Sequence, residues 1–179
     1  MKGRELLIGV TGGIAAYKTA ALTSQLVQAG AGVSVIMTDS AREFIGAATF
    51  EALTGRPVRT GVLHESGHPL GAHIELAERA ELLCVAPATA NYLAKAAHGL
   101  ADDLLSTLTL SFAGKIVVAP AMNCEMWAKP AVQRNVEQLR RDGFVIVDPE
   151  EGWLSCRRQG AGRMASPEKI FAIVAEQLK

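Results

Sequence analysis

The sequence predicts a single α/β domain in which helices cover both faces of a Rossmann-like (flavodoxin-like) parallel sheet. Short apolar runs alternate with segments of helical periodicity along the chain, as they do when crossover helices join parallel strands. A glycine-containing turn separates the first apolar run from the first helical segment, where a sheet of this kind can bind a phosphate. The 179 residues fit one domain, and we find neither repeats nor a linker, so residues 1–179 are expected to form one unit.

The chain begins with a predicted strand, helix and strand. Residues 5–11 are an almost unbroken apolar run, which indicates a strand that is buried on both faces. Residues 14–29 place apolar side chains at helical spacing, and Gly30 suits the end of that helix. Residues 33–38 form a second apolar run, for which we predict the second strand.

Two short helices and a loop are expected next. Ser40 is a suitable N-cap for a helix over residues 41–44, and residues 47–53 favour another short helix. Residues 60–72 are rich in glycine and contain two histidines and a proline, so they predict a loop.

A third core strand and two helices are predicted in the middle of the chain. The strand covers residues 82–86, and the helices cover residues 91–97 and 102–112. Asp102 and Asp103 lie in the first turn of the second helix, where acidic side chains complement the helix dipole. The alternative interpretation, a carboxylate pair for acid–base chemistry, is the weaker one.

The last third of the chain adds two strands, two helices and a long loop. Residues 116–119 and 144–147 predict strands, and residues 130–142 predict a helix with proline at its first position. Residues 149–165 contain several glycines and predict a loop. We interpret it as a clamp over the substrate, because loops of this length in compact domains are usually functional or disordered. Ser166, followed by proline, begins a terminal helix.

Charge, hydropathy and cysteine content exclude several classes of function. Eighteen basic and eighteen acidic residues cancel, so neither nucleic acid nor a membrane is an expected partner. Apolar residues make up 49% of the chain and the mean hydropathy is +0.19, which favours a homo-oligomer with apolar interfaces. We find no signal peptide and no run near the roughly 20 apolar residues of a membrane span. Three scattered cysteines indicate a reducing, cytoplasmic location.

The segment Pro120-Ala-Met-Asn-Cys-Glu-Met-Trp127 is the most informative motif of the chain. It directly follows a predicted strand, and ligands of open α/β sheets bind beyond the carboxyl ends of the strands. The amide of Asn123 can orient a carboxylate or a carbonyl group, while the methionines and the tryptophan exclude water. The alternative is a strand-to-helix loop that packs its apolar side chains into the core.

Gly12 and Gly13 lie in the turn between the first strand and the first helix. Glycine there lets backbone NH groups approach a phosphate at the start of a helix. The turn is not a P-loop, because Tyr17 stands where that motif needs glycine, and it lacks the Gly-x-Gly-x-x-Gly spacing of dinucleotide folds. A mononucleotide such as FMN fits this single phosphate turn, with Thr38 as a hydroxyl ligand. The alternative is a tight turn that binds nothing.

The motif set resembles the flavin-containing cysteine decarboxylases from about residue 5 to the C-terminus. The resemblance is carried by residues 9–18, 87–91, 101–107 and 152–164, by the isolated His73-Ile-Glu-Leu76 and by Pro120-x-Met-Asn-x-x-Met-Trp127. The last of these elements is highly specific, whereas the glycine turn alone is weak. The resemblance implies bound FMN as the cofactor. It implies FMN contacts from Gly12, Gly13, Ile14, Thr38, Thr89, Ala90, Asn91 and Ala121.

The resemblance also implies catalytic roles. His73 matches the family's catalytic histidine and would act as an acid–base group. Asn123 would hydrogen-bond the substrate carboxylate, and Cys156 would donate a proton to a reduced intermediate. Substrate contacts are implied for Asn123, Met126, Arg163 and Met164. Without the resemblance, a lone histidine is usually an ordinary surface or core residue, and a free cysteine is usually an inert small hydrophobe.

His64 and His68 suggest a metal pair by their spacing alone. No cysteine or acidic cluster completes a ligand set around them, so we expect no metal.

For function, the resemblance implies FMN-dependent decarboxylation of 4'-phosphopantothenoylcysteine to 4'-phosphopantetheine in coenzyme A biosynthesis. The reaction would pass through transient oxidation to a thioaldehyde, loss of CO₂ and re-reduction. The alternatives are a peptidyl-cysteine oxidative decarboxylase, which acts on a C-terminal cysteine of a precursor peptide, and a non-catalytic flavin-binding regulatory subunit. The family commonly has Ala-Cys-Gly-Asp where this chain has Ser155-Cys-Arg-Arg158, and this departure puts the substrate in question.

Two kinds of partner are implied by the same resemblance. Family members form trimers or assemblies of trimers, so a homo-oligomer, either a trimer or a dodecamer, is expected. A separate phosphopantothenate-cysteine ligase is an expected partner in the same pathway.

Overall fold

The computed structural model describes residues 1–61, 72–154 and 157–179, with the backbone alone for residues 72 and 73. The strands are β1 (Glu5–Val10), β2 (Gly32–Met37), β3 (Leu82–Ala88), β4 (Lys115–Pro120), β5 (Val145–Ile146), β6 (Glu150–Trp153) and β7 (Gln159–Arg163). The helices are α1 (Ala16–Gln28), α2 (Asp39–Arg42), α3 (Ala47–Thr54), α4 (Ala72–Arg79), α5 (Ala90–His98), α6 (Leu104–Ser111), α7 (Cys124–Trp127), α8 (Pro130–Arg141) and α9 (Pro167–Gln177).

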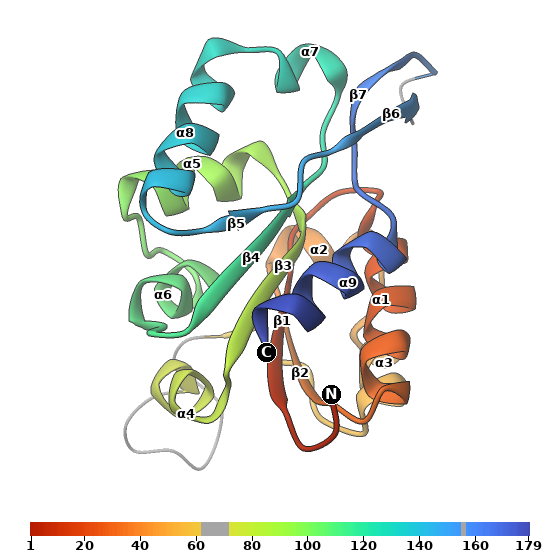
Figure 1. The fold of residues 1–179 in the computed structure, drawn as a ribbon, viewed down its shortest axis with the longest axis vertical. Helices are drawn as coiled ribbons and strands as arrows, with labels where there is room; N and C mark the ends of the chain where they lie inside the picture. Colours follow the sequence, from red (N-terminus) through yellow and green to blue (C-terminus); the bar gives the residue numbers. More distant parts are fainter. Residues whose placement is uncertain (62–71, 155–156) are drawn as a thin grey trace.

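The first five strands form one parallel sheet in the order β2-β1-β3-β4-β5 (Figure 1). This is the flavodoxin-like order, in which ligands bind beyond the carboxyl ends of β1 and β3, where the strand order reverses. The predicted α/β fold with a flavodoxin-like parallel sheet is therefore confirmed.

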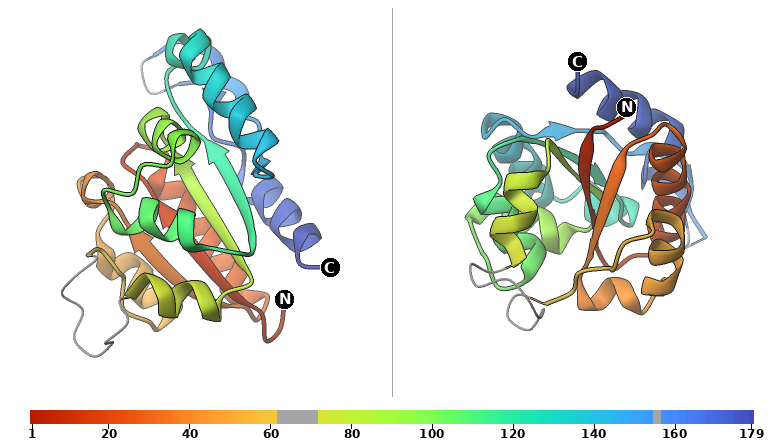
Figure 2. Two further views of the ribbon diagram at one scale, coloured as in Figure 1. Left: turned by 90° about the vertical axis from the view of Figure 1, so that its left-hand side faces the viewer. Right: turned by 90° about the horizontal axis from the view of Figure 1, so that it is seen from below.

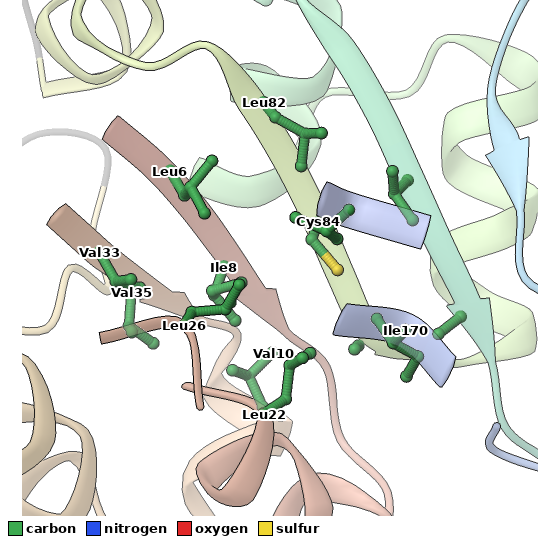
Figure 3. Packing of buried hydrophobic residues seen from close by; sticks show 14 of the residues in the cluster. Leu6, Ile8, Val10, Leu22, Leu26, Val33, Val35, Leu82, Cys84 and Ile170 are labelled. Atoms are coloured by element: carbon green, nitrogen blue, oxygen red, sulfur yellow. The ribbon is translucent and has the colours of Figure 1, made fainter. Parts of the chain in front are cut away.

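Helices cover both faces of the sheet (Figures 1 and 2). Helices α1, α3 and α9 lie on one face, and α4, α5, α6 and α8 lie on the other. Because successive strand residues point to opposite faces, Leu6, Ile8 and Val10 of β1 belong to the core beneath α1 and α9, whereas Leu7 belongs to the opposite core. Figure 3 shows the first of these cores, with Ile170 of α9 packed against the sheet. Burial on both faces explains why β1 is apolar throughout.

The prediction of a loop over residues 149–165 is wrong in part, because the segment contains two strands. It contains an antiparallel hairpin of β6 and β7, and its tip is closed by bonds from the Leu154 NH to the Arg158 carbonyl (2.8 Å) and from the Arg157 NH to the Leu154 carbonyl (2.9 Å). The glycines within both strands concealed this structure in the sequence, because glycine has a low strand propensity and gives no alternating pattern. Figure 1 shows the hairpin beyond the upper end of the sheet, near α7.

Helices α4 and α7 are absent from the sequence-based prediction. Helix α7 has four residues and is fixed by its cap, and α4 buries one described side chain, Leu76. Such short elements leave little periodic signal. No helix in the described ranges is both long and apolar enough to span a lipid bilayer.

Candidate active site

A pocket of about 440 Å³ lies at the carboxyl end of the sheet. It is lined by the turns that follow β1, β3 and β4, by the first turn of α1, and by the hairpin of β6 and β7. The volume is in the range of small-molecule sites, and the position is the reversal point at which this topology binds ligands.

A network of threonine hydrogen bonds ties together the turns that line the pocket. The hydroxyl of Thr11 donates to the carbonyl of Pro87 (2.7 Å) and accepts from the NH of Thr89 (3.0 Å). The hydroxyl of Thr19 on α1 donates to the carbonyl of Ala86 (2.7 Å). These bonds join the ends of β1 and β3 to α1, so the two turns that line the pocket are held in fixed relative positions.

The glycine turn approaches α2 as closely as glycine allows. A Cβ at Gly12 would lie 2.9 Å from both the carbonyl carbon and the carbonyl oxygen of Ser40. A Cβ at Gly13 would meet only the methyl group of Thr89, at 3.9 Å, because this residue faces the pocket. Position 12 is thus restricted by packing, and position 13 borders the ligand space.

Two helices begin at the pocket. Helix α5 follows Thr89, whose hydroxyl caps the NH of Tyr92 (3.3 Å), and α1 begins at Ala16 just after the glycine turn. The first turns of both helices carry the positive end of the helix dipole. In α1 the NH groups of Ala16 and Lys18 already donate to the carbonyls of Gly13 and Ala15 (2.9 Å each). This end of the pocket favours an anion.

Asn123 is the N-cap of α7 and lines the pocket. Its side-chain oxygen accepts from the NH of Glu125 at 2.7 Å. Because that oxygen serves the helix, the NH₂ group is the part of the amide that remains for a ligand, and among the described residues it has no hydrogen-bond partner. Asn123 is therefore fixed as a hydrogen-bond donor.

The side of the pocket formed by Lys18 of α1 and Arg163 of β7, here called the hairpin wall, is positively charged. Lys18 and Arg163 line the pocket, and no acidic residue does so among the described lining residues. The ammonium of Lys18 donates to the Met164 carbonyl at 3.1 Å. Burial and the nearby charge of Arg163 lower the pKa of Lys18, against the opposing effect of Glu150 and Glu168.

The structure brings most of the predicted site residues to this one pocket. From the predicted cofactor set it places Gly12, Gly13, Ile14, Thr89, Ala90 and Ala121 there, and from the predicted substrate set Asn123, Met126, Arg163 and Met164. Their roles stay predictions.

Thr38 and Asn91 are not among the pocket-lining residues. The hydroxyl of Thr38 caps α2 through the NH of Ala41 (3.3 Å), and Asn91 is exposed on α5. Their predicted contacts with a cofactor also remain predictions.

Several further lining residues are absent from the predicted site, among them Tyr17, Lys18 and Trp153. A signal for Lys18 was present, because it follows Ile14 by four residues and shares a face with it in the helix predicted over residues 14–29. Trp153 is 68% exposed, which is unusual for its type and marks the outer rim of the pocket.

The predicted catalytic residue His73 does not line this pocket. His73 is the second residue of α4, whose last residue, Arg79, contacts Glu5 at the amino end of β1 (3.5 Å). The pocket is at the opposite end of the sheet, as Figures 1 and 2 show for α4 and the hairpin. Cys156, like His64 and His68, lies outside the described residues. Within the described part of the chain, no group of three or more histidine, cysteine or acidic side chains has the arrangement of a metal site.

Asp103 has a structural role. It is the N-cap of α6 in a capping box with Ser106, and both it and Asp102 pair with Lys95 (2.9 and 2.6 Å). Burial raises the pKa of Asp103, but the hydrogen bonds from Lys95 and Ser106 outweigh it and lower the pKa.

Comparisons with known proteins identify the family of this chain and proteins of similar structure. A family model described as Flavoprotein matches residues 1–179. The coenzyme A biosynthesis bifunctional protein CoaBC of Bacillus subtilis is 47% identical over 173 residues, which are 97% of this chain and 43% of that protein. The chain therefore spans less than half the length of this relative.

Two solved structures are similar over almost the whole chain. A PPC decarboxylase mutant complexed with pantothenoylaminoethenethiol has a TM-score of 0.87 at 29% identity and covers 98% of both chains. The FMN-dependent cysteine decarboxylase SpaF has a TM-score of 0.84 at 38% identity and covers 99% of this chain and 98% of its own.

Proposed function

The chain belongs to the flavoprotein family, and from this premise we propose that it is an FMN-dependent carboxy-lyase that converts 4'-phosphopantothenoylcysteine to 4'-phosphopantetheine in coenzyme A biosynthesis. The observation that carries the proposal is the pocket, which combines an open glycine turn, the Asn123 donor and a positively charged wall. The similarity to CoaBC and to the PPC decarboxylase mutant supports the choice of substrate.

The pocket fits FMN at the glycine turn. Gly13 leaves open space beside Thr89, and the positive ends of the α1 and α5 helix dipoles favour a single phosphate there. Gly12, Gly13, Ile14, Thr89, Ala90 and Ala121 would hold the cofactor. Bound FMN would supply a reversible two-electron acceptor for oxidation of the substrate at the carbon next to sulfur.

Asn123 would orient the carboxylate that leaves as CO₂. Its oxygen is held by the cap of α7, so its NH₂ group points a donor at the substrate without a change of conformation. A carboxylate held by a fixed neutral donor keeps its orientation, and it is not stabilised as strongly as it would be by a cation. This arrangement suits a group that must lose its charge in the reaction.

The hairpin would act as the clamp that excludes water. Met126 of α7, Trp153 of β6 and Met164, directly after β7, give the pocket apolar surfaces. Met164 is buried, whereas Trp153 is exposed at the rim and can cover a bound substrate. An apolar cover would protect the enethiolate left after CO₂ loss from water.

His73 would reach the pocket from another copy of the chain. Its helix contacts the amino end of β1, so it lies far from the pocket of its own chain. A homo-oligomer, either a trimer or a dodecamer, would solve this by sharing sites between subunits. Exposed apolar side chains at the pocket rim, Ile14 and Tyr17, support such an interface.

Cys156 would be the proton donor of the reductive step. It lies in the sequence between β6 and β7, which both line the pocket. The PPC decarboxylase structure with bound pantothenoylaminoethenethiol supports an enethiol intermediate in the related reaction. We place the reaction in the cytoplasm, with the phosphopantothenate-cysteine ligase activity as its source of substrate.

A peptidyl-cysteine decarboxylase is the second candidate. The similarity to SpaF, at 38% identity, favours a cysteine decarboxylase in the wider sense. The departure at Ser155-Cys-Arg-Arg158 also bears on the substrate, because Arg158 pairs with Glu125 beside Asn123 (3.6 Å).

Turnover of two cysteine substrates separates the candidates. We expect a yellow protein whose extracted cofactor is FMN, and CO₂ release from 4'-phosphopantothenoylcysteine with saturated 4'-phosphopantetheine as the product. CO₂ release only from a peptide with a C-terminal cysteine, with an enethiol product, would establish the second candidate. Bound FMN without CO₂ release from either substrate would indicate a regulatory flavoprotein.

A further inference from the structure

We propose that Lys18 and Arg163 form a subsite for a phosphate monoester dianion on the hairpin wall, and that it binds the phosphate at the end of the substrate remote from the reacting cysteine. The inference rests on the proposed function and adds to it the residues that select a phosphorylated substrate.

The side chain of Lys18 is partly buried, lines the pocket and is held by a hydrogen bond. It lies in the first turn of α1, and its ammonium donates to the Met164 carbonyl at 3.1 Å, which fixes the charge at the base of the hairpin. An ammonium has three N–H donors, so two remain after this bond. They belong to a side chain that lines the pocket.

Arg163 is held across the neighbouring strand. A Cβ at Gly152 of β6 would lie 3.0 Å from Nη1 and 3.2 Å from Cδ of Arg163. The absence of a side chain at Gly152 therefore allows the guanidinium to lie along the hairpin beside the pocket. A planar guanidinium with several N–H donors is well suited to phosphate oxygens.

Among the described residues, no acidic side chain lines the pocket beside the two cations. Burial and the charge of Arg163 disfavour the charged form of Lys18, and Glu150 and Glu168 offset this effect. Both carboxylates are engaged on the α9 side, Glu168 with Gln25 (3.0 Å) and Glu150 with the NH of Ser166 (3.4 Å). Neither lines the pocket. A bound dianion would compensate the two cations from inside the pocket, where neither acid lies.

The FMN phosphate and the substrate carboxylate are already assigned to other parts of the pocket. The glycine turn with the first turns of α1 and α5 suits the FMN phosphate, and the NH₂ group of Asn123 suits the substrate carboxylate. The Lys18 ammonium, held at the Met164 carbonyl, and the Arg163 guanidinium add positive charge on the hairpin side of the pocket. The proposed substrate carries a second anionic group, its phosphate, which matches this region.

The test compares substrates that differ only in the phosphate. Lys18→Met and Arg163→Met are measured as FMN-loaded proteins with 4'-phosphopantothenoylcysteine and with pantothenoylcysteine. Calorimetric binding of 4'-phosphopantetheine and of pantetheine provides a readout that needs no turnover. Lys115→Met is the matched control, because Lys115 is exposed at the amino end of β4. Lys18→Arg keeps the charge, and Gly152→Ala displaces Arg163 without removing its charge.

Each charge-removing variant should reduce the preference for the phosphorylated compound by about 10- to 100-fold, in kcat/KM and in binding. Lys18→Arg should retain most of the preference, Gly152→Ala should reduce it, and Lys115→Met should leave it at the wild-type value. An unchanged preference in both charge-removing variants would overturn the proposal. So would an equal loss for both compounds, which would show that Lys18 merely holds the hairpin.

The FMN dissociation constant distinguishes the second source of phosphate. A large increase in this constant, with an unchanged substrate preference, would assign the subsite to the FMN phosphate and overturn its assignment to the substrate. If the wild-type protein releases no CO₂ from either compound, the proposed function fails. The calorimetric preference for 4'-phosphopantetheine over pantetheine then still decides whether Lys18 and Arg163 bind a phosphate.

Discussion

The backbone NH of Met122 donates to the carbonyl oxygen of Gly162 at 2.9 Å, and this bond docks the hairpin onto the segment that follows β4. A Cβ at Gly162 would overlap the carbonyl oxygen of Met122. Gly162 also has a φ of +130°, which side chains rarely tolerate. The hairpin can therefore approach the pocket this closely only with glycine at position 162.

Gly162→Ala should destabilise the hairpin more than backbone strain alone explains. We expect a loss of about 1–3 kcal/mol in the free energy of unfolding, from strained backbone and from the overlap with Met122. Gly99→Ala is the matched control, since Gly99 has a φ of +68° but open space around its Cβ position, and it should cost about 1 kcal/mol. Denaturant unfolding measures both losses, and hydrogen exchange over residues 150–163 should accelerate only in Gly162→Ala. Equal losses in the two variants would show that the close approach does not matter.

Gly12→Ala should weaken FMN binding by moving α2 away from the turn. The added methyl group would lie within 2.9 Å of the Ser40 backbone, which cannot yield as a flexible side chain does. Absorbance of the purified protein and titration of the apoprotein with FMN measure the effect, which we expect to be at least about tenfold in the dissociation constant. Gly46→Ala, with nothing near its Cβ position, is the control. Full FMN occupancy in Gly12→Ala at wild-type affinity would argue against this turn as the cofactor site.

The parallel sheet could be predicted because its strands are buried on both faces and therefore read as continuous apolar runs. Residues 5–11 and 82–86 gave that signal, and the strands formed there. The hairpin gave none, because Gly152, Gly160 and Gly162 carry no alternating pattern. It is docked by a bond to Met122, which lies about 40 residues away in the sequence and is brought near only by the fold.

The candidate site was predictable where one motif carries several residues. Asn123 and Met126 come from one short segment, so a single strand end fixes both. Lys18 and Arg163 come from opposite ends of the chain and have no local signal that they share a wall. Their relationship follows from the packing of α1 against the base of the hairpin, which the sequence does not reveal.

Asn123→Asp should preserve α7 and abolish decarboxylation. Aspartate is as good an N-cap as asparagine, so the bond to the Glu125 NH is retained. The remaining oxygen would face the substrate carboxylate as a second negative charge instead of a donor. We expect kcat/KM for CO₂ release to fall by at least about 100-fold, with normal FMN absorbance and normal thermal unfolding. A rate near that of the wild type would show that the amide does not touch the carboxylate.

Glu5→Gln should make stability less sensitive to acid. Hydrogen bonds from Arg56 (2.6 and 2.9 Å) hold the pKa of Glu5 below its ordinary value of 4.5, against the effect of burial. Because the folded pKa is the lower one, this stabilisation is present above about pH 4.5 and is lost as the pH falls through the folded pKa.

At pH 7 Glu5→Gln should lower the free energy of unfolding by about 1–2 kcal/mol, and the difference from the wild type should shrink below pH 4.5. Glu137→Gln, which breaks an exposed pair with Arg141, is the control and should cost no more than about 0.5 kcal/mol. A constant difference between pH 3 and pH 7 would contradict the assignment.

Mixed oligomers should show whether His73 and Asn123 act in one site from different chains. His73→Asn and Asn123→Asp are each expected to release no CO₂ while they keep FMN. If a site combines His73 of one chain with Asn123 of another, random mixing leaves about one site in four with both native residues, so about a quarter of the wild-type activity should return. The two variants are unfolded together and refolded as a mixture, each variant refolded alone is the control, and sedimentation confirms that oligomers form. Mixtures that form oligomers and stay inactive would place both residues in one chain, which the distance between α4 and the pocket makes the harder arrangement to build.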